Sequence, residues 1–197
     1  MPELKTILEA LLLAAGEPLS PDRLLEAFPE TERPDGDALR AALAQLAADY
    51  AGRGMELVEV ASGLRLQVPK AFSPWVSRLW EERATRYSRA LLETLALIAY
   101  RQPITRGEIE EVRGVSLSGG IMKTLQERGW IKVIGHREVP GRPALYATTR
   151  AFLDYFSLKS LSELPPLAAP RDLDAIGAEL ENRAGAAPPA DFPSQTG

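Results

Sequence analysis

The residues Ala14-Ala15-Gly16-Glu17-Pro18-Leu19-Ser20 end one apolar helical run and begin the next, and Ala99-Tyr100-Arg101-Gln102-Pro103-Ile104-Thr105 do the same 85 positions later. A second pair of stretches agrees with the first. Residues 53–58 (Arg-Gly-Met-Glu-Leu-Val) match residues 128–133 (Arg-Gly-Trp-Ile-Lys-Val), where a glycine ends a helix and a strand begins. The chain is therefore predicted to contain two copies of one small domain.

The order of elements predicted for each copy is three helices and then a β-hairpin, which is the order of a winged helix. We predict a fold that is mainly α with small β-hairpins (α+β), made of two tandem winged-helix domains plus a disordered C-terminal tail. The predicted parts are an N-terminal winged-helix domain at 1–80, a connector at 81–87, a second winged-helix domain at 88–160 and a Pro/Ala-rich tail at 161–197. The tail has six prolines and few aromatic residues, a composition typical of disorder.

Hydrophobic periodicity and capping signals place the elements of each copy. In the first copy they predict helices at 3–15, 21–28 and 37–50 and strands at 55–60 and 63–68. In the second copy they predict helices at 88–100, 105–113, 117–129 and 149–156 and strands at 131–137 and 144–148. Ser20 before Pro21, and the capping box from Thr105 to Glu108, mark two of the helix starts.

Two stretches of the first copy carry more apolar residues than expected. The helix at 3–15 is too apolar for one covered face, so it is either central to a core or shared with another subunit. After the hairpin, five apolar residues share one helical face: Phe72, Trp75, Val76, Leu79 and Trp80. We expect this second face to pack on its own domain.

The composition argues against an enzyme and against a bound cofactor. The 197 residues include no cysteine and one histidine, His136, which leaves no disulfide, no thiolate, no multi-histidine metal site and no convincing catalytic triad. The sequence also lacks a phosphate-binding glycine loop. The longest apolar stretch, Ala10 to Ala15, is far shorter than the ~20 residues of a membrane span. We predict no catalytic, cofactor or metal residues and a soluble, cytoplasmic protein.

The charge is uneven along the chain. Residues 1–80 carry 8 basic and 12 acidic side chains, whereas residues 81–160 carry 13 and 9. Direct DNA contact is therefore predicted only in the second copy, at Lys123, Arg128 and Lys132, and with weak, nonspecific affinity of roughly 10⁻⁴ to 10⁻⁶ M. A winged-helix DNA-binding transcriptional regulator remains the alternative function.

A set of planar or amphipathic side chains in the second copy is typical of protein interfaces. The set consists of Tyr100, Gln102, Arg113, Arg137, Arg142 and Tyr146. Each also has a purely structural interpretation. The two tyrosines fit a core with satisfied hydroxyls, Arg113 fits the end of a helix, and Arg142 fits an exposed hairpin tip.

The second copy resembles a known family. The similarity lies in residues 93–105, Arg113-Gly114-Val115, Pro140-Gly141-Arg142-Pro143 with Leu145-Tyr146, and 161–167 (Leu-Ser-Glu-Leu-Pro-Pro-Leu). It extends to the first copy through Glu9-Ala10-Leu11-Leu12, Gly16-Glu17-Pro18-Leu19 and the stretch from Arg53-Gly54 to Gln67. These motifs are similar to the bacterial segregation and condensation protein B (ScpB) family over about 1–167.

The resemblance implies a non-catalytic subunit of the SMC–kleisin condensin, which supports chromosome condensation and segregation. It implies a homodimer formed mainly by the first domain, for which the apolar first helix offers Leu8, Leu11 and Leu12. It also implies that the second domain binds the kleisin ScpA, and through it the SMC ATPase, with the six interface-type residues as candidates. The expected location is the cytoplasm, at the nucleoid. The resemblance assigns no role to the tail from 168 to 197, which stays unassigned.

Overall fold

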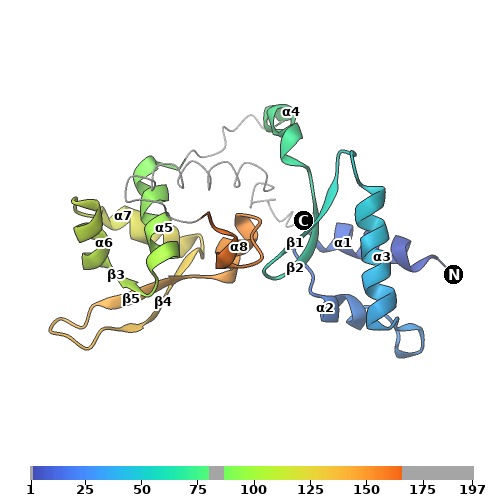
Figure 1. Ribbon diagram of the computed structural model, residues 1–197, viewed down its shortest axis with the longest axis horizontal. Coiled ribbons are helices and arrows are strands. Elements are labelled where there is room, and N and C mark those ends of the chain that lie inside the picture. The colour runs from blue at the N-terminus through green and yellow to red at the C-terminus, as the bar shows by residue number, and fades with distance from the viewer. Residues whose placement is uncertain (1, 80–86, 166–197) are drawn as a thin grey trace, which may run out of the picture. The chain divides into compact units, whose positions relative to one another are not determined.

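The computed structural model describes residues 2–79 and 87–165 (Figure 1). The chain divides into two compact units with the boundary between Ala84 and Thr85. Most of the predicted connector at 81–87, and the predicted tail beyond residue 165, lie outside the described residues. The first unit is described through residues 2–79 and the second through residues 87–165.

The first unit begins with three helices and continues with a β-hairpin, in the predicted order. Its elements are α1 (Leu4–Ala15), α2 (Pro21–Glu26), η1 (Glu30–Glu32), α3 (Gly36–Asp49), β1 (Glu56–Val60), β2 (Gly63–Gln67), η2 (Lys70–Phe72), α4 (Ser73–Val76) and η3 (Ser77–Leu79). Gly16 ends α1 in the left-handed conformation, with φ 66°. Ser20 caps α2 by accepting a hydrogen bond from the N–H of Arg23, as predicted.

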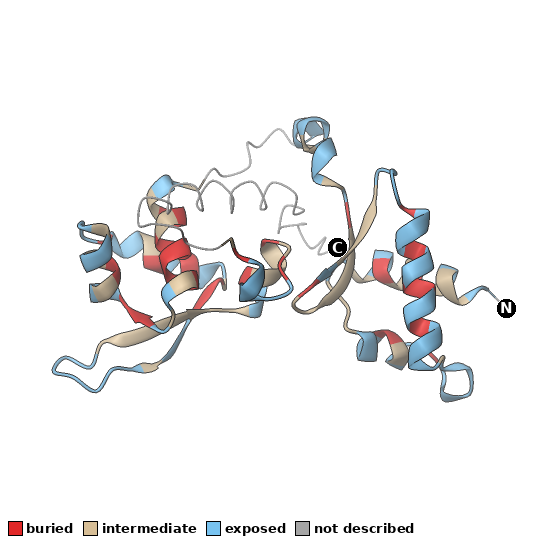
Figure 2. Ribbon diagram, in the orientation of Figure 1, coloured by how far each residue is buried: buried red, intermediate tan, exposed pale blue. Residues whose placement is uncertain are grey.

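The core of the first unit lies between α1, α2 and α3. Leu8 and Leu12 of α1 are 0% and 3% exposed, and they pack with Leu24, Leu39 and other apolar residues of the unit (Figure 2). Leu8 and Leu12 are thus enclosed by their own domain, and the dimer contact expected of them stays a prediction. Leu11 is half-buried against the same core.

The apolar face that follows the hairpin does not pack as predicted. Phe72, Trp75 and Leu79 are 37%, 66% and 76% exposed, and Trp80 lies outside the described residues. The stretch forms three short turns instead of one helix. Pro74 explains the break, because it has no N–H to donate to the carbonyl of Lys70 in a continuous α-helix.

The second unit repeats the three helices and adds a three-stranded sheet. Its elements are α5 (Arg89–Arg101), β3 (Ile104–Thr105), α6 (Arg106–Arg113), α7 (Gly119–Glu127), β4 (Ile131–His136), β5 (Ala144–Thr148), α8 (Arg150–Tyr155) and η4 (Leu161–Glu163). The sheet is antiparallel with the order β3-β5-β4. The sequence did not predict β3, because two residues are too short to show an alternating pattern.

Helix α5 is the central element of the second core. It buries residues on nearly all sides, from Leu91 to Ala99, and Thr94 satisfies its hydroxyl by donating to the carbonyl of Ala90 at 2.7 Å. The rings of Trp130 and Phe156 lie against each other with centroids 5.2 Å apart. The many apolar residues of α5 are thus explained by burial inside one domain.

One strand pairing is common to the two units. Leu19 in the first unit forms an isolated antiparallel bridge with Leu64 of β2, and Ile104, 85 positions after Leu19, pairs with Tyr146 of β5. Both units therefore join the segment before their second helix to the second strand of their hairpin. The coarse prediction of helices with small antiparallel sheets is confirmed. No described helix is long and apolar enough to cross a bilayer.

Candidate protein-interaction site

Gln102 joins the end of α5 to the end of β5. Its side-chain carbonyl Oε1 accepts hydrogen bonds from the N–H of Thr148 at 2.7 Å and from the Thr148 hydroxyl at 3.1 Å. Its Nε2 donates to the carbonyl of Ala99 at 3.0 Å. Both the oxygen and the nitrogen of the Gln102 side-chain amide thus form hydrogen bonds within the unit. These bonds position the sheet relative to α5.

The two tyrosines of the predicted set are half-buried against the core of the second unit. The Tyr100 hydroxyl donates to the carbonyl of Pro165 at 2.5 Å. Tyr146 lies in the central strand β5, opposite Ile104 on one side and Val133 on the other. The structural interpretation, a core tyrosine with a satisfied hydroxyl, thus fits Tyr100, and both tyrosines remain partly exposed.

Arg113 ties the end of α6 to α5. Its Nη2 lies 3.0 Å from Oε2 of Glu93, and its side chain is only 9% exposed. The other carboxylate oxygen of Glu93 accepts from Nε of Arg89 at 2.9 Å. Within the described structure, Nε of Arg113 is buried without a hydrogen-bond partner. Because a buried charge that loses its partner is costly, this pair fixes the two helices to each other.

Arg137 fastens the β4–β5 hairpin to α6 through Glu108. The guanidinium meets the carboxylate with two contacts, Nη1 to Oε1 at 2.9 Å and Nη2 to Oε2 at 3.1 Å. Glu108 also closes the predicted capping box, since it accepts from the N–H of Thr105 at 2.8 Å. The hydrogen bonds from Thr105, more than the Arg137 charge, lower the pKa of Glu108 below its usual value of 4.5.

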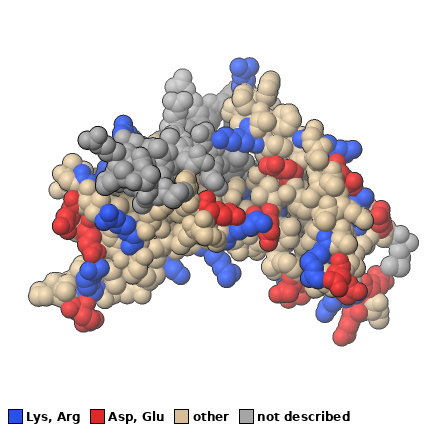
Figure 3. Space-filling model, viewed as in Figure 1, with Lys and Arg blue, Asp and Glu red and all other residues tan. Residues whose placement is uncertain are grey.

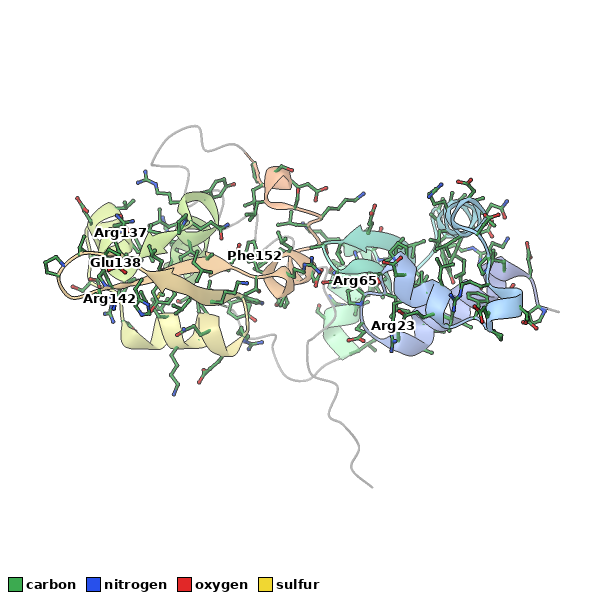
Figure 4. All side chains as sticks on the ribbon, turned by 90° about the horizontal axis from the view of Figure 1, so that it is seen from below. Arg23, Arg65, Arg137, Glu138, Arg142 and Phe152 are labelled. Carbon is green, nitrogen blue, oxygen red and sulfur yellow. The ribbon has the colours of Figure 1, made fainter. Side chains whose placement is uncertain are left out.

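The tip of the hairpin, residues 137–143, is the most exposed part of the predicted site. The N–H of Arg137 donates to the carbonyl of Pro143 at 2.9 Å, which closes the tip. Arg142 has a φ of 37° and reaches Glu138 at 3.0 Å, with both side chains at least 70% exposed. Figure 4 shows Arg137, Glu138 and Arg142 together at this end of the second unit. Sequence reasoning missed Val139, an exposed apolar residue at the same tip.

The three candidate DNA contacts differ in how far they are engaged. Lys123 lies 3.6 Å from Glu127, and the Arg128 guanidinium lies 5.4 Å from the centre of the Tyr87 ring. Lys132 is exposed on β4 and has no ion pair among the described residues. On the face shown in Figure 3, basic and acidic side chains are interspersed. Such a surface does not form the basic stripe expected of a dedicated DNA-binding domain.

The described residues hold no cluster of three or more histidine, aspartate and glutamate side chains able to bind a metal ion. Ion pairs and hydrogen bonds fix the β4–β5 hairpin of the second unit. Its tip exposes two cations, Arg137 and Arg142, and one apolar side chain, Val139. Such an arrangement is suited to recognising another polypeptide.

The comparisons with known proteins agree on one family. The model of the segregation and condensation complex subunit ScpB matches residues 6–167. A segregation and condensation protein B homolog from Coxiella burnetii is 57% identical over 176 residues, which cover 89% of this chain and 84% of the relative. Segregation and condensation protein B from Syntrophotalea carbinolica is 48% identical over 84% of this chain and 82% of the relative.

The same protein from Bacillus subtilis is 42% identical over 90% of this chain and 89% of its own length. The alternative function, a DNA-binding transcriptional regulator, has no support in these matches. The matches extend through both units and agree with the resemblance seen in the sequence motifs. The chain belongs to the ScpB family of segregation and condensation complex subunits.

Proposed function

We propose that this chain is a non-catalytic subunit of an SMC–kleisin complex, made of two winged-helix domains, that forms a homodimer through its first unit and binds the kleisin ScpA through its second. Through ScpA it acts with the SMC ATPase in chromosome condensation and segregation, in the cytoplasm at the nucleoid and without a cofactor. The family membership supports the role in segregation and condensation. The hairpin tip supports the location of the binding site.

The observation that carries the proposal is the fixed position of this tip. Arg137 is held on Glu108 by two contacts, while Arg142 remains largely exposed. A surface that is ordered before binding loses little conformational entropy when a partner arrives. Arg142 and Val139 thus offer one planar cation and one apolar contact to a passing segment of ScpA.

The six candidate residues have two kinds of role in this proposal. The kleisin contacts Arg137 and Arg142 directly. It also contacts the exposed parts of Tyr100 and Tyr146. Gln102 and Arg113 act as positioning residues, because their polar groups hold α5 to β5 and to α6.

The proposal is tested by reversing the charge of Arg142. We expect Arg142→Glu to weaken binding of full-length ScpA at least ~10-fold, or about 1.4 kcal/mol, in isothermal titration calorimetry. The exposed pair with Glu138 contributes roughly 0 to 1 kcal/mol to folding, so the melting temperature should change little. Arg150→Glu is the matched control, since Arg150 is an exposed arginine of the same unit away from the tip. Equal affinity of Arg142→Glu and wild type for ScpA would remove the hairpin tip from the binding site.

A further inference from the structure

The stretch from Val68 to Leu79, which we name the arm, follows the hairpin of the first unit and is the most exposed apolar feature of that unit. Phe72, Trp75 and Leu79 line it, and the ring centroids of Phe72 and Trp75 are 6.5 Å apart. Single exposed apolar residues are ordinary, but a tryptophan and a leucine more than 60% exposed on one short segment mark an interaction surface.

The arm is not covered by its own unit. Its extensive contacts run among its own three turns, η2, α4 and η3, and not to α1, α2 or α3. Figure 1 shows α4 standing clear of α1 and α3, and Figure 2 shows it without buried residues. The apolar side chains of the arm are therefore left without a surface of their own unit to pack against.

The first unit also exposes apolar side chains on the outer face of α1. Ala10, Leu13 and Ala14 are exposed on the side of α1 opposite the core residues Leu8 and Leu12. Leu13 is 64% exposed. The alanine side chains are small, so a large ring can approach the helix closely beside Leu13. This face accounts for the apolar excess of the first helix.

The charges of the arm and of the rest of the unit are opposite. The arm carries Lys70 and Arg78 and no acidic residue, whereas residues 2–67 carry 6 basic and 12 acidic side chains. Glu17 follows the exposed face of α1 directly. Attraction between a net positive segment and a net negative body favours their association and opposes contact between two arms.

We infer that the arm of each copy packs on the outer face of α1 of a second copy of this chain. The arm and the outer face of α1 both belong to the first unit. Two reciprocal contacts therefore form at once and close a twofold dimer. This inference rests on the proposed homodimer and gives it a defined surface. It replaces the contact predicted for Leu8 and Leu12 by one through Leu13 and the arm.

The first test measures the mass of the full chain by light scattering over a dilution series. Wild type is expected at twice the 21.5 kDa of one chain. Trp75→Asp and Leu79→Asp should raise the dissociation constant of the dimer at least about 30-fold, as expected for interface anchors. Val115→Asp places the same charge on an exposed apolar residue of the second unit and should leave the dimer intact.

The second test uses the absence of cysteine in the chain. Ser77→Cys on the arm and Ala14→Cys on α1 are both exposed positions, so neither change should disturb folding. A short bismaleimide reagent should give a covalent dimer when the two single-cysteine proteins are mixed, and far less with either protein alone.

Two results would overturn the inference, and they are distinguishable. If wild type is monomeric at every concentration, the proposed homodimer fails and the arm exchange fails with it. If wild type is a dimer but Trp75→Asp and Leu79→Asp dimerise as wild type and the mixed cysteine proteins do not crosslink, the dimer stands and its assignment to the arm is wrong.

Discussion

Replacing Gln102 with alanine should destabilise the second unit substantially, because the side chain makes three internal hydrogen bonds. Two are accepted from Thr148 and one is donated to the carbonyl of Ala99. A net contribution of roughly 0.5 to 1.5 kcal/mol for each bond gives a loss of about 1.5 to 4.5 kcal/mol, and the lower part of this range applies because water reaches the half-buried site. We take ~2 kcal/mol, which corresponds to a fall in melting temperature of about 8 to 15 °C for a unit of this size.

Differential scanning calorimetry of the full chain is the appropriate assay, since the transition of the second unit is the one that should move. Thr148→Val removes only the hydroxyl donor and should cost about 1 kcal/mol. Gln126→Ala is the matched control, because Gln126 is exposed on α7 and its replacement should have little effect. If Gln102→Ala melts within ~2 °C of wild type, a change worth less than about 0.5 kcal/mol, the positioning role assigned to Gln102 is refuted.

The remaining predictions concern the first core, the capping glutamate and the buried arginine. Leu8→Ala should lower the free energy of unfolding by about 2 to 5 kcal/mol in urea denaturation, because Leu8 is fully buried, and an unchanged stability would contradict its place in the core. The folded-state pKa of Glu108 is lowered, so its stabilising effect is present above pH 4.5 and is lost as the pH falls through the folded value. Glu108→Gln should therefore be less stable than wild type at pH 7 in urea denaturation, and the difference should shrink on acidification. Glu93→Gln leaves the charge of Arg113 buried without its carboxylate and should cost about 3 kcal/mol in the same assay, whereas a neutral effect would show that the pair is dispensable.

Signals that act over a few residues were readable in the sequence. Ser20 and Thr105 cap their helices as predicted, and Gly16 ends α1 through a left-handed conformation. The two hairpins also formed at the predicted places. Each of these features depends on neighbours within about one helical turn or one strand pair, so local chemistry is sufficient to specify it.

Features that depend on tertiary contacts were harder to predict from the sequence. Apolar periodicity could not tell whether Leu8 faces a core or another subunit, since both environments select the same side chains. The periodicity of the arm suggested a covered helix, but Pro74 interrupts the hydrogen-bond ladder and the turns stay exposed. The pairing of Arg113 with Glu93, 20 positions earlier, is fixed only by the packing of α6 on α5. The residue types of the candidate site were therefore readable, whereas their internal partners were not.

Co-purification of the full chain with the ScpA of the same organism, followed by mass measurement by light scattering, tests the central claim most directly. We expect a stable complex in which ScpA is retained together with two or more copies of this chain. If the chain elutes alone at 21.5 kDa with no ScpA bound to it, both the proposed dimer and the proposed binding of ScpA are wrong.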